Sequence, residues 1–185
     1  MRRFLPVILL TFLLVGCSRS GNIEPAISLR NKLLQANGCC FHAIITADYG
    51  EHIYSFKMDC QSDEKGNIHF SVLEPETISG ITGEIDGEGG KLTFFEKILA
   101  FPLLADEQLT PVSVPWLLVR TLRGGYIGAG GRDGDLYKVQ MDDSYEDDPL
   151  RVDVWFNDMG DPVHCDFLWN NRRILTAKIE EFHIL

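Results

Sequence analysis

CCFHAIITADYGEHIYSFKMDC, residues 39–60, is the stretch that decides the fold. Apolar and polar side chains alternate along both of its halves, on either side of Tyr49-Gly50. A period of two is typical of a β-strand with one buried face, and a short glycine-containing centre is typical of a hairpin turn. With Asp48 opposite Glu51, the apolar sets of both strands fall on one face. The stretch therefore predicts an antiparallel hairpin with one apolar side.

The same alternation recurs along most of the chain after this hairpin. The segments that carry it are residues 68–72, 77–86, 91–98, 126–130, 135–141, 150–156, 163–169 and 174–182. Stretches rich in glycine and aspartate separate several of them, as is typical of turns. Around residues 87–90, with Asp86 facing Lys91, the alternation places Ile85 opposite Leu92. The alternation breaks near Glu180-Glu181, which predicts a bulge in the last strand. A sheet of about ten antiparallel strands must curl or close.

Two segments carry helical signals instead. Residues 24–37 have Pro25 in the first turn, and Asn37-Gly38 follows as a stop. In the apolar insert 102–124, Pro115 opens a second helix. Because one apolar sheet face needs a cover, we predict an α+β fold. It is a curled antiparallel sheet, or half-open barrel, of about ten strands, covered by an N-terminal helix and a central helical insert.

The first residues predict an export signal. Arg2 and Arg3 precede an apolar run that is too short to span a membrane comfortably. The run ends in LVGC, residues 14–17, which resembles the lipobox of bacterial lipoproteins and so implies cleavage before Cys17 and lipidation of that residue. The alternative is an ordinary secretory signal in which Cys17 is incidental. The predicted organisation is a signal peptide (1–16), a lipidated tether (17–23) and a single barrel domain (24–185).

FSVLEPETISG, residues 70–80, resembles the strand-proline-strand segment of the LolA/LolB-like family of envelope lipoprotein carriers. The order of helix, strands, helical insert and further strands is also similar to that family. The resemblance implies a half-open barrel plugged by helices, with a cavity that holds acyl chains. The sequence shows no protruding apolar loop of the LolB type, and no functional residue can be transferred by position.

The inward-facing apolar set is the one candidate binding surface in the sequence. The candidates are Phe41, Ile45, Tyr54, Phe56, Met58, Phe70, Phe94, Trp116, Val154, Phe156 and Phe167. Aromatic rings and methionine suit an adaptable apolar pocket, and they suit a filled core equally. Two functions therefore stay open. One is an anchored lipoprotein that binds a lipid or the acyl chain of another lipoprotein; the other is a structural or protein-interaction lipoprotein with a filled core and no ligand.

The cysteines give a structural prediction. On the predicted register Cys39 lies opposite Cys60 on the inward face, within reach of a disulfide in an oxidising compartment. Cys40 replaces Cys39 as the partner if a bulge shifts the register. We expect Cys165 to face inward opposite Val154 as a buried thiol.

Charge and spacing exclude several classes of function. A net charge of −10 argues against a protein that follows nucleic-acid phosphates. The histidines lack the spacing of a metal site, and no catalytic pair can be placed on one surface. We therefore expect no enzyme, no metal and no cofactor. We expect a monomer anchored through Cys17 to a bacterial cell membrane on its extracytoplasmic side.

Overall fold

The structure is a computed structural model that describes residues 22–48, 50, 52–95, 97–101, 104–105, 108–145 and 149–185. The predicted signal peptide, Cys17 and residues 17–21 of the predicted tether lie outside these residues. Within the described part, no helix has the length and apolar character needed to cross a membrane.

A single antiparallel sheet dominates the described part of the chain. Its eleven strands are β1 (Cys39–Asp48), β2 (Ile53–Ser62), β3 (Ile68–Glu74), β4 (Thr82–Ile85), β5 (Gly90–Phe94), β6 (Lys97–Phe101), β9 (Tyr126–Asp133), β10 (Leu136–Asp142), β11 (Arg151–Phe156), β12 (Pro162–Trp169) and β13 (Arg172–Ile184). Two short strands, β7 (Leu104–Ala105) and β8 (Gln108–Leu109), pair separately, and η1 (Glu76–Ile78) and η2 (Pro111–Ser113) are single 3₁₀ turns.

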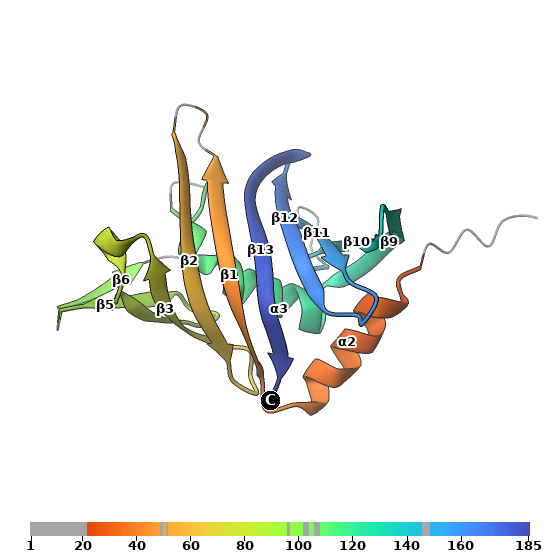
Figure 1. The fold of residues 1–185 in the computed structure, drawn as a ribbon, viewed down its shortest axis with the longest axis horizontal. Helices are drawn as coiled ribbons and strands as arrows, with labels where there is room; N and C mark the ends of the chain where they lie inside the picture. The colour runs from red at the N-terminus through yellow and green to blue at the C-terminus, as the bar shows by residue number, and fades with distance from the viewer. Residues whose placement is uncertain are drawn as a thin grey trace, which may run out of the picture.

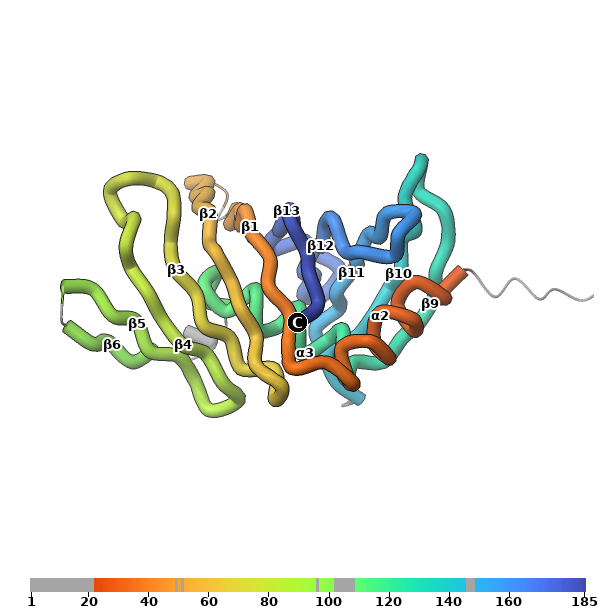
Figure 2. Tube along the Cα trace, turned by 60° about the horizontal axis from the view of Figure 1, so that its bottom comes forward, coloured from red at the N-terminus to blue at the C-terminus, as the bar shows by residue number. Residues whose placement is uncertain are grey.

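The first and last strands of the sheet meet at its centre. The order is β6-β5-β4-β3-β2-β1-β13-β12-β11-β10-β9, so β6 and β9 are the two edges and do not pair with each other. Figure 2 shows these edges at opposite ends of the curved sheet. The predicted fold class is confirmed: the sheet is curled and unclosed, and it has eleven strands where about ten were expected.

Two helices accompany the sheet. The first, α2 (Glu24–Gln35), buries one side, with Ala26, Leu29 and Leu33 in the core. The second, α3 (Val114–Gly124), is buried over most of its length and lies behind the central strands in Figure 1. Both begin with a proline in the first turn, where its missing N–H costs nothing. Because eight of its eleven residues are buried, α3 fills the inside of the curled sheet as a central helix, while Arg120 stays exposed.

The predicted register of the first hairpin is wrong by two residues. Asp48 pairs with Ile53 instead of Glu51, and Phe41 instead of Cys39 lies opposite Cys60. The Asp48 carboxylate accepts a hydrogen bond from the Gly50 N–H at 2.8 Å, and the pairing of Asp48 with Ile53 leaves four residues between the strands where two were predicted. A shift of two keeps every side chain on its predicted face.

The β4–β5 hairpin shows a second displacement of two residues. Ile85 pairs with Gly90, whereas the sequence pattern placed it opposite Leu92. The Asp86 carboxylate accepts hydrogen bonds from the N–H groups of Glu88 and Gly89, which makes the turn tighter than predicted. Gly90 therefore enters β5.

The predicted bulge in the last strand is confirmed. The pairing of β1 with β13 shifts between Cys40 and His42. Opposite this shift, Glu181 has φ +51°, a left-handed conformation in which the extra residue of a bulge is accommodated.

Candidate binding surface

Most of the predicted cavity residues are packed into the core. Phe41, Ile45, Met58, Phe70, Trp116, Val154, Phe156 and Phe167 are buried, and Phe56 is partly buried against them. Their neighbours include Leu118, Val119 and Leu122 of α3. The helix therefore occupies the space in which the sequence placed a ligand cavity.

Two of the predicted cavity residues are not in the core. Tyr54 is 55% exposed and Phe94 is 38% exposed. Tyr54 lies near the start of β2 and Phe94 at the end of β5, each next to the turn that closes its hairpin. The alternation correctly placed both side chains on the inner side of the sheet, but at these strand ends the inner side is only partly covered by other residues.

The β5–β6 hairpin exposes apolar side chains on both of its faces. Phe95 is 82% exposed, Ile98 is 71% exposed and Leu99 is 64% exposed. The rings of Phe94 and Phe95 lie 4.3 Å apart, and Phe95 has φ +44°, a region that aromatic residues rarely adopt. We call Phe94, Phe95, Ile98 and Leu99 the hairpin patch. A cluster of exposed apolar groups of this kind marks a binding surface.

The inner side of this hairpin continues into the core. Leu92 pairs with Leu99, and Phe94 pairs with Lys97, so these four side chains share the concave side of the sheet. Leu92 is only partly buried and packs against the core. The apolar surface therefore runs from the core out to Phe94 and Leu99 without a polar interruption on these strands. Ile98 is on the opposite, outer side.

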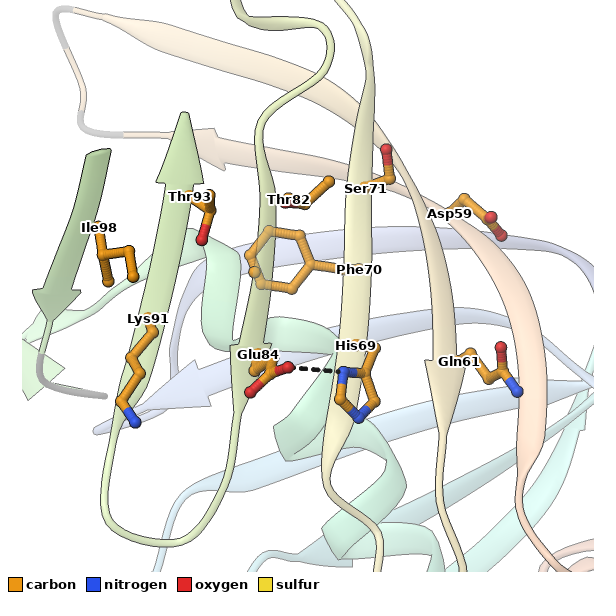
Figure 3. A pocket seen from close by; sticks show the side chains of 11 residues that line it. Asp59, Gln61, His69, Phe70, Ser71, Thr82, Glu84, Lys91, Thr93 and Ile98 are labelled. Atoms are coloured by element: carbon orange, nitrogen blue, oxygen red, sulfur yellow. Dashed lines mark ion pairs between the residues drawn. The ribbon is translucent and has the colours of Figure 1, made fainter. Parts of the chain in front are cut away.

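A polar groove of about 470 Å³ crosses the outer side of β2 to β6. Its lining residues are Asp59, Gln61, His69, Phe70, Ser71, Thr82, Gly83, Glu84, Lys91, Thr93 and Ile98. Figure 3 shows the His69 ring facing Glu84, with 3.3 Å between Nδ1 and Oε1. Both side chains are more than half exposed, so this pair adds little stability. Charged and hydroxyl groups alternate in this groove with apolar side chains such as Phe70 and Ile98, so it lacks the continuous apolar surface that suits an acyl chain.

A second hollow, of about 410 Å³, lies beside the end of α3. Its lining residues are Arg120, Gly124, Asp143, Ser144 and Tyr145. Arg120 Nη1 lies 3.6 Å from Asp143 Oδ2, and its guanidinium lies 5.2 Å from the centre of the Trp116 ring. This hollow is also lined by charged groups.

The predicted disulfide is absent from the structure, in which Cys39, Cys40, Cys60 and Cys165 are free thiols. The two-residue shift places Cys39 beside Ser62, whose hydroxyl accepts a hydrogen bond from the Cys39 N–H at 2.9 Å. Burial raises the pKa of Cys39 to about 11 and also raises the pKa values of Cys60 and Cys165. Cys165 is buried opposite Val154, as the sequence predicted.

An ionic cluster that the sequence pattern did not predict lies on the outer side of β10 to β13. Asp153 and Asp166 lie directly opposite each other, and both are buried. Arg151 and Lys138 each lie 2.8 Å from a carboxylate oxygen of Asp153. The other carboxylate, Asp166, is 2.9 Å from His164 Nε2 and 3.4 Å from Arg173 Nη1. The sequence feature that could have predicted this cluster is the spacing of its charged residues. Arg151 and Asp153, like His164 and Asp166, are two residues apart and so lie on one face of a strand. In the described part of the chain, no three His, Cys, Asp or Glu side chains are grouped so that they could hold a metal ion.

No model of a known protein family matches the sequence, and no curated protein is similar to it in sequence. Solved structures similar to it include an uncharacterized conserved protein from Thermus thermophilus, with a TM-score of 0.47, 10% identity, and coverage of 88% of this chain and 86% of that chain. A LolA superfamily protein from Nitrosomonas europaea has a TM-score of 0.43 and 8% identity over 86% of this chain and 93% of its own. The lipoprotein LppX from Mycobacterium tuberculosis has a TM-score of 0.38 and 10% identity over 87% of this chain and 96% of its own. One of these structures is described as a LolA superfamily protein, but with TM-scores below 0.5 and identities of 10% or less these similarities assign the chain neither a family nor a function.

Proposed function

We propose that this chain is a membrane-anchored extracytoplasmic lipoprotein that binds an apolar ligand, a lipid or the acyl chain of another lipoprotein. The binding site is the inner side of the β5–β6 hairpin, and the protein acts by binding without catalysis. The anchor is Cys17, at the end of the LVGC stretch that resembles a lipobox.

The exposure of the hairpin patch carries this proposal. Core residues with the same strand pattern, such as Phe156, are fully buried, while Leu99 is 64% exposed. Burying an exposed leucine side chain contributes about 1.5–3 kcal/mol. An acyl chain laid along Leu92, Leu99 and Phe94 would supply the cover that these strands lack. Because the predicted cavity residues among the described residues are mostly packed in the core, the proposal places the ligand on this surface instead of in an internal cavity.

The test uses a long-chain fatty acid with a photoactivatable diazirine on its chain. The full lipidated protein, reconstituted in phosphatidylcholine nanodiscs, is irradiated with this probe, and mass spectrometry maps the crosslinked peptides. Crosslinks are expected within residues 91–101, and Leu99→Asp is expected to lower their yield at least fivefold. Met159→Asp is the matched control, because Met159 is a comparably exposed apolar residue outside the hairpin. Crosslinks spread evenly over the surface, or unchanged by Leu99→Asp, would overturn the proposal.

The filled core also favours a second candidate, a lipoprotein that binds another protein. Among the described strands β6 is an edge of the sheet, with exposed Ile98 and Leu99, and a sheet edge can accept a strand from a partner. This candidate predicts that Ile98→Lys and Leu99→Lys abolish co-purification of one defined envelope protein from crosslinked cells. It is rejected if the same proteins co-purify with the unchanged chain and with both variants.

A further inference from the structure

We infer that the ligand of the β5–β6 hairpin is an anionic amphiphile, a fatty acid whose carboxylate binds Lys97 while its chain lies against Leu99 and Phe94. This inference rests on the proposed function and deepens it, because it names the head group. It follows from the position of Lys97, from the absence of an ion-pair partner for it among the described residues, and from the net charge of the protein.

Lys97 is on the ligand side of the hairpin. It pairs with Phe94 across the β5–β6 ladder, and Leu99 follows two residues later on the same side. Cross-strand neighbours of this kind lie about 5 Å apart at their Cβ atoms. An acyl chain on Phe94 and Leu99 therefore ends within reach of the Lys97 ammonium, whose four-carbon stem packs readily against apolar surface.

Lys97 is exposed, and none of the carboxylates in the described part of the chain forms an ion pair with it. The other lysine of the hairpin, Lys91, is on the opposite side, directly across the β4–β5 ladder from Glu84. The two lysines therefore differ in both side and neighbour, although they lie on the same hairpin. Of these two lysines, only Lys97 places its ammonium group beside the exposed apolar surface on the concave side of the sheet.

The overall charge makes this position selective. The chain carries a net charge of −10, so most of its surface repels an anion. A cation beside an apolar surface is complementary to a carboxylate at the end of an acyl chain. A neutral chain of equal length would gain the apolar contact alone. The charge contact at an exposed site contributes up to about 1 kcal/mol, which corresponds to roughly a fivefold preference for the acid.

The experiment compares diazirine-labelled palmitic acid with its methyl ester on the full lipidated protein in phosphatidylcholine nanodiscs. The acid is expected to crosslink residues 91–101 about threefold to fivefold more than the ester. Lys97→Gln is expected to bring the two yields together by lowering that of the acid, with the ester unchanged. Lys91→Gln, the matched control, is expected to keep the preference. Raising the salt concentration to about 0.5 M is expected to reduce it, because salt screens exposed charges.

The possible failures are distinguishable. Equal crosslinking of acid and ester at the hairpin in the unchanged protein overturns the inference and leaves the proposed function standing. A preference for the acid that survives Lys97→Gln, or is lost in Lys91→Gln, overturns the role of Lys97. The absence of crosslinks at the hairpin with either probe overturns the proposed function as well.

Discussion

Arg30 of α2 binds the C-terminal end of α3, and Arg123 of α3 binds the C-terminal end of α2. Arg30 donates to the carbonyl oxygens of Leu122 at 2.8 Å, Thr121 at 3.1 Å and Gly125 at 2.6 Å, all in or next to the last turn of α3. Arg123 donates to the carbonyl of Leu33 in the last turn of α2 at 2.8 Å. The final carbonyls of a helix have no partner within the helix and carry its negative dipole end. This exchange therefore gives hydrogen-bond donors to carbonyl oxygens at the ends of both helices and links the two helices to each other.

Replacing Arg30 by lysine is expected to destabilise the protein by about 1–3 kcal/mol, since an ammonium cannot reach three carbonyls with the fork of a guanidinium. The free energy of unfolding from urea titrations followed by circular dichroism measures this loss. Arg172→Lys, at an exposed position in β13, is the control and is expected to change stability by less than about 0.5 kcal/mol. Equal stability of the two variants would show that the helix exchange contributes nothing.

Gly83 is required because an aromatic ring lies over it. A Cβ atom at this position would lie 2.6 Å from the Lys91 carbonyl oxygen and against the ring of Phe70, which is its cross-strand neighbour. Gly83→Ala is therefore expected to cost about 1–3 kcal/mol through overpacking. Gly87→Ala, where no atom lies within 4 Å, is expected to be close to neutral. Thermal unfolding of both variants separates the effect of the ring from that of losing a glycine.

The cysteines are expected to differ in reactivity. Because burial raises the pKa of Cys39 to about 11, only about one molecule in a thousand carries its thiolate at pH 8. Cys60 and Cys165 are also buried, while Cys40 is partly exposed. Brief treatment of the native protein with iodoacetamide is expected to modify Cys40 alone among these four, and treatment in guanidinium is expected to modify all four. A peptide in which Cys39 and Cys60 are joined would contradict the structure.

Alternation in the sequence determines which face a side chain takes but not which residue it opposes. The two register errors, at Asp48 and at Ile85, are both displacements of two residues, and both keep the buried set unchanged. The turns decided the register through aspartate side chains that bind nearby N–H groups. The alternation of apolar and polar residues does not reveal these turn hydrogen bonds. It did correctly predict the pairing of Val154 with Cys165.

The sequence also does not tell which part of an apolar face is covered. Phe94 and Phe156 have the same strand pattern, yet one is exposed and the other is fully buried. The difference depends on where α3 lies under the curved sheet, which is a tertiary property. The same limit applies to Asp153 and Asp166, whose burial arises from the basic side chains that surround them.

Acid is expected to weaken the protein through Asp166. Burial alone would raise the pKa of this carboxyl, but the hydrogen bond and charge of His164, together with Arg173, hold it below its usual value. A depressed pKa in the folded state means that Asp166 stabilises the fold above the ordinary aspartate pKa of about 3.9. That contribution is lost as the pH falls through the lower, folded-state pKa.

Asp166→Asn is therefore expected to lower the free energy of unfolding at pH 7 by about 1–3 kcal/mol. Between about pH 5 and pH 2 the stability of this variant is expected to fall less steeply than that of the unchanged protein. In the unchanged protein the unfolded chain binds a proton at Asp166 more readily than the folded chain does, and the asparagine removes this difference. Arg173→Gln is expected to give an intermediate slope, since His164 still donates to the carboxylate. Urea titrations at several pH values measure both slopes. Parallel curves for the unchanged protein and Asp166→Asn would mean that the Asp166 carboxylate has the same proton affinity in the folded and unfolded chains, and that Asp166 does not contribute to the acid sensitivity of the fold.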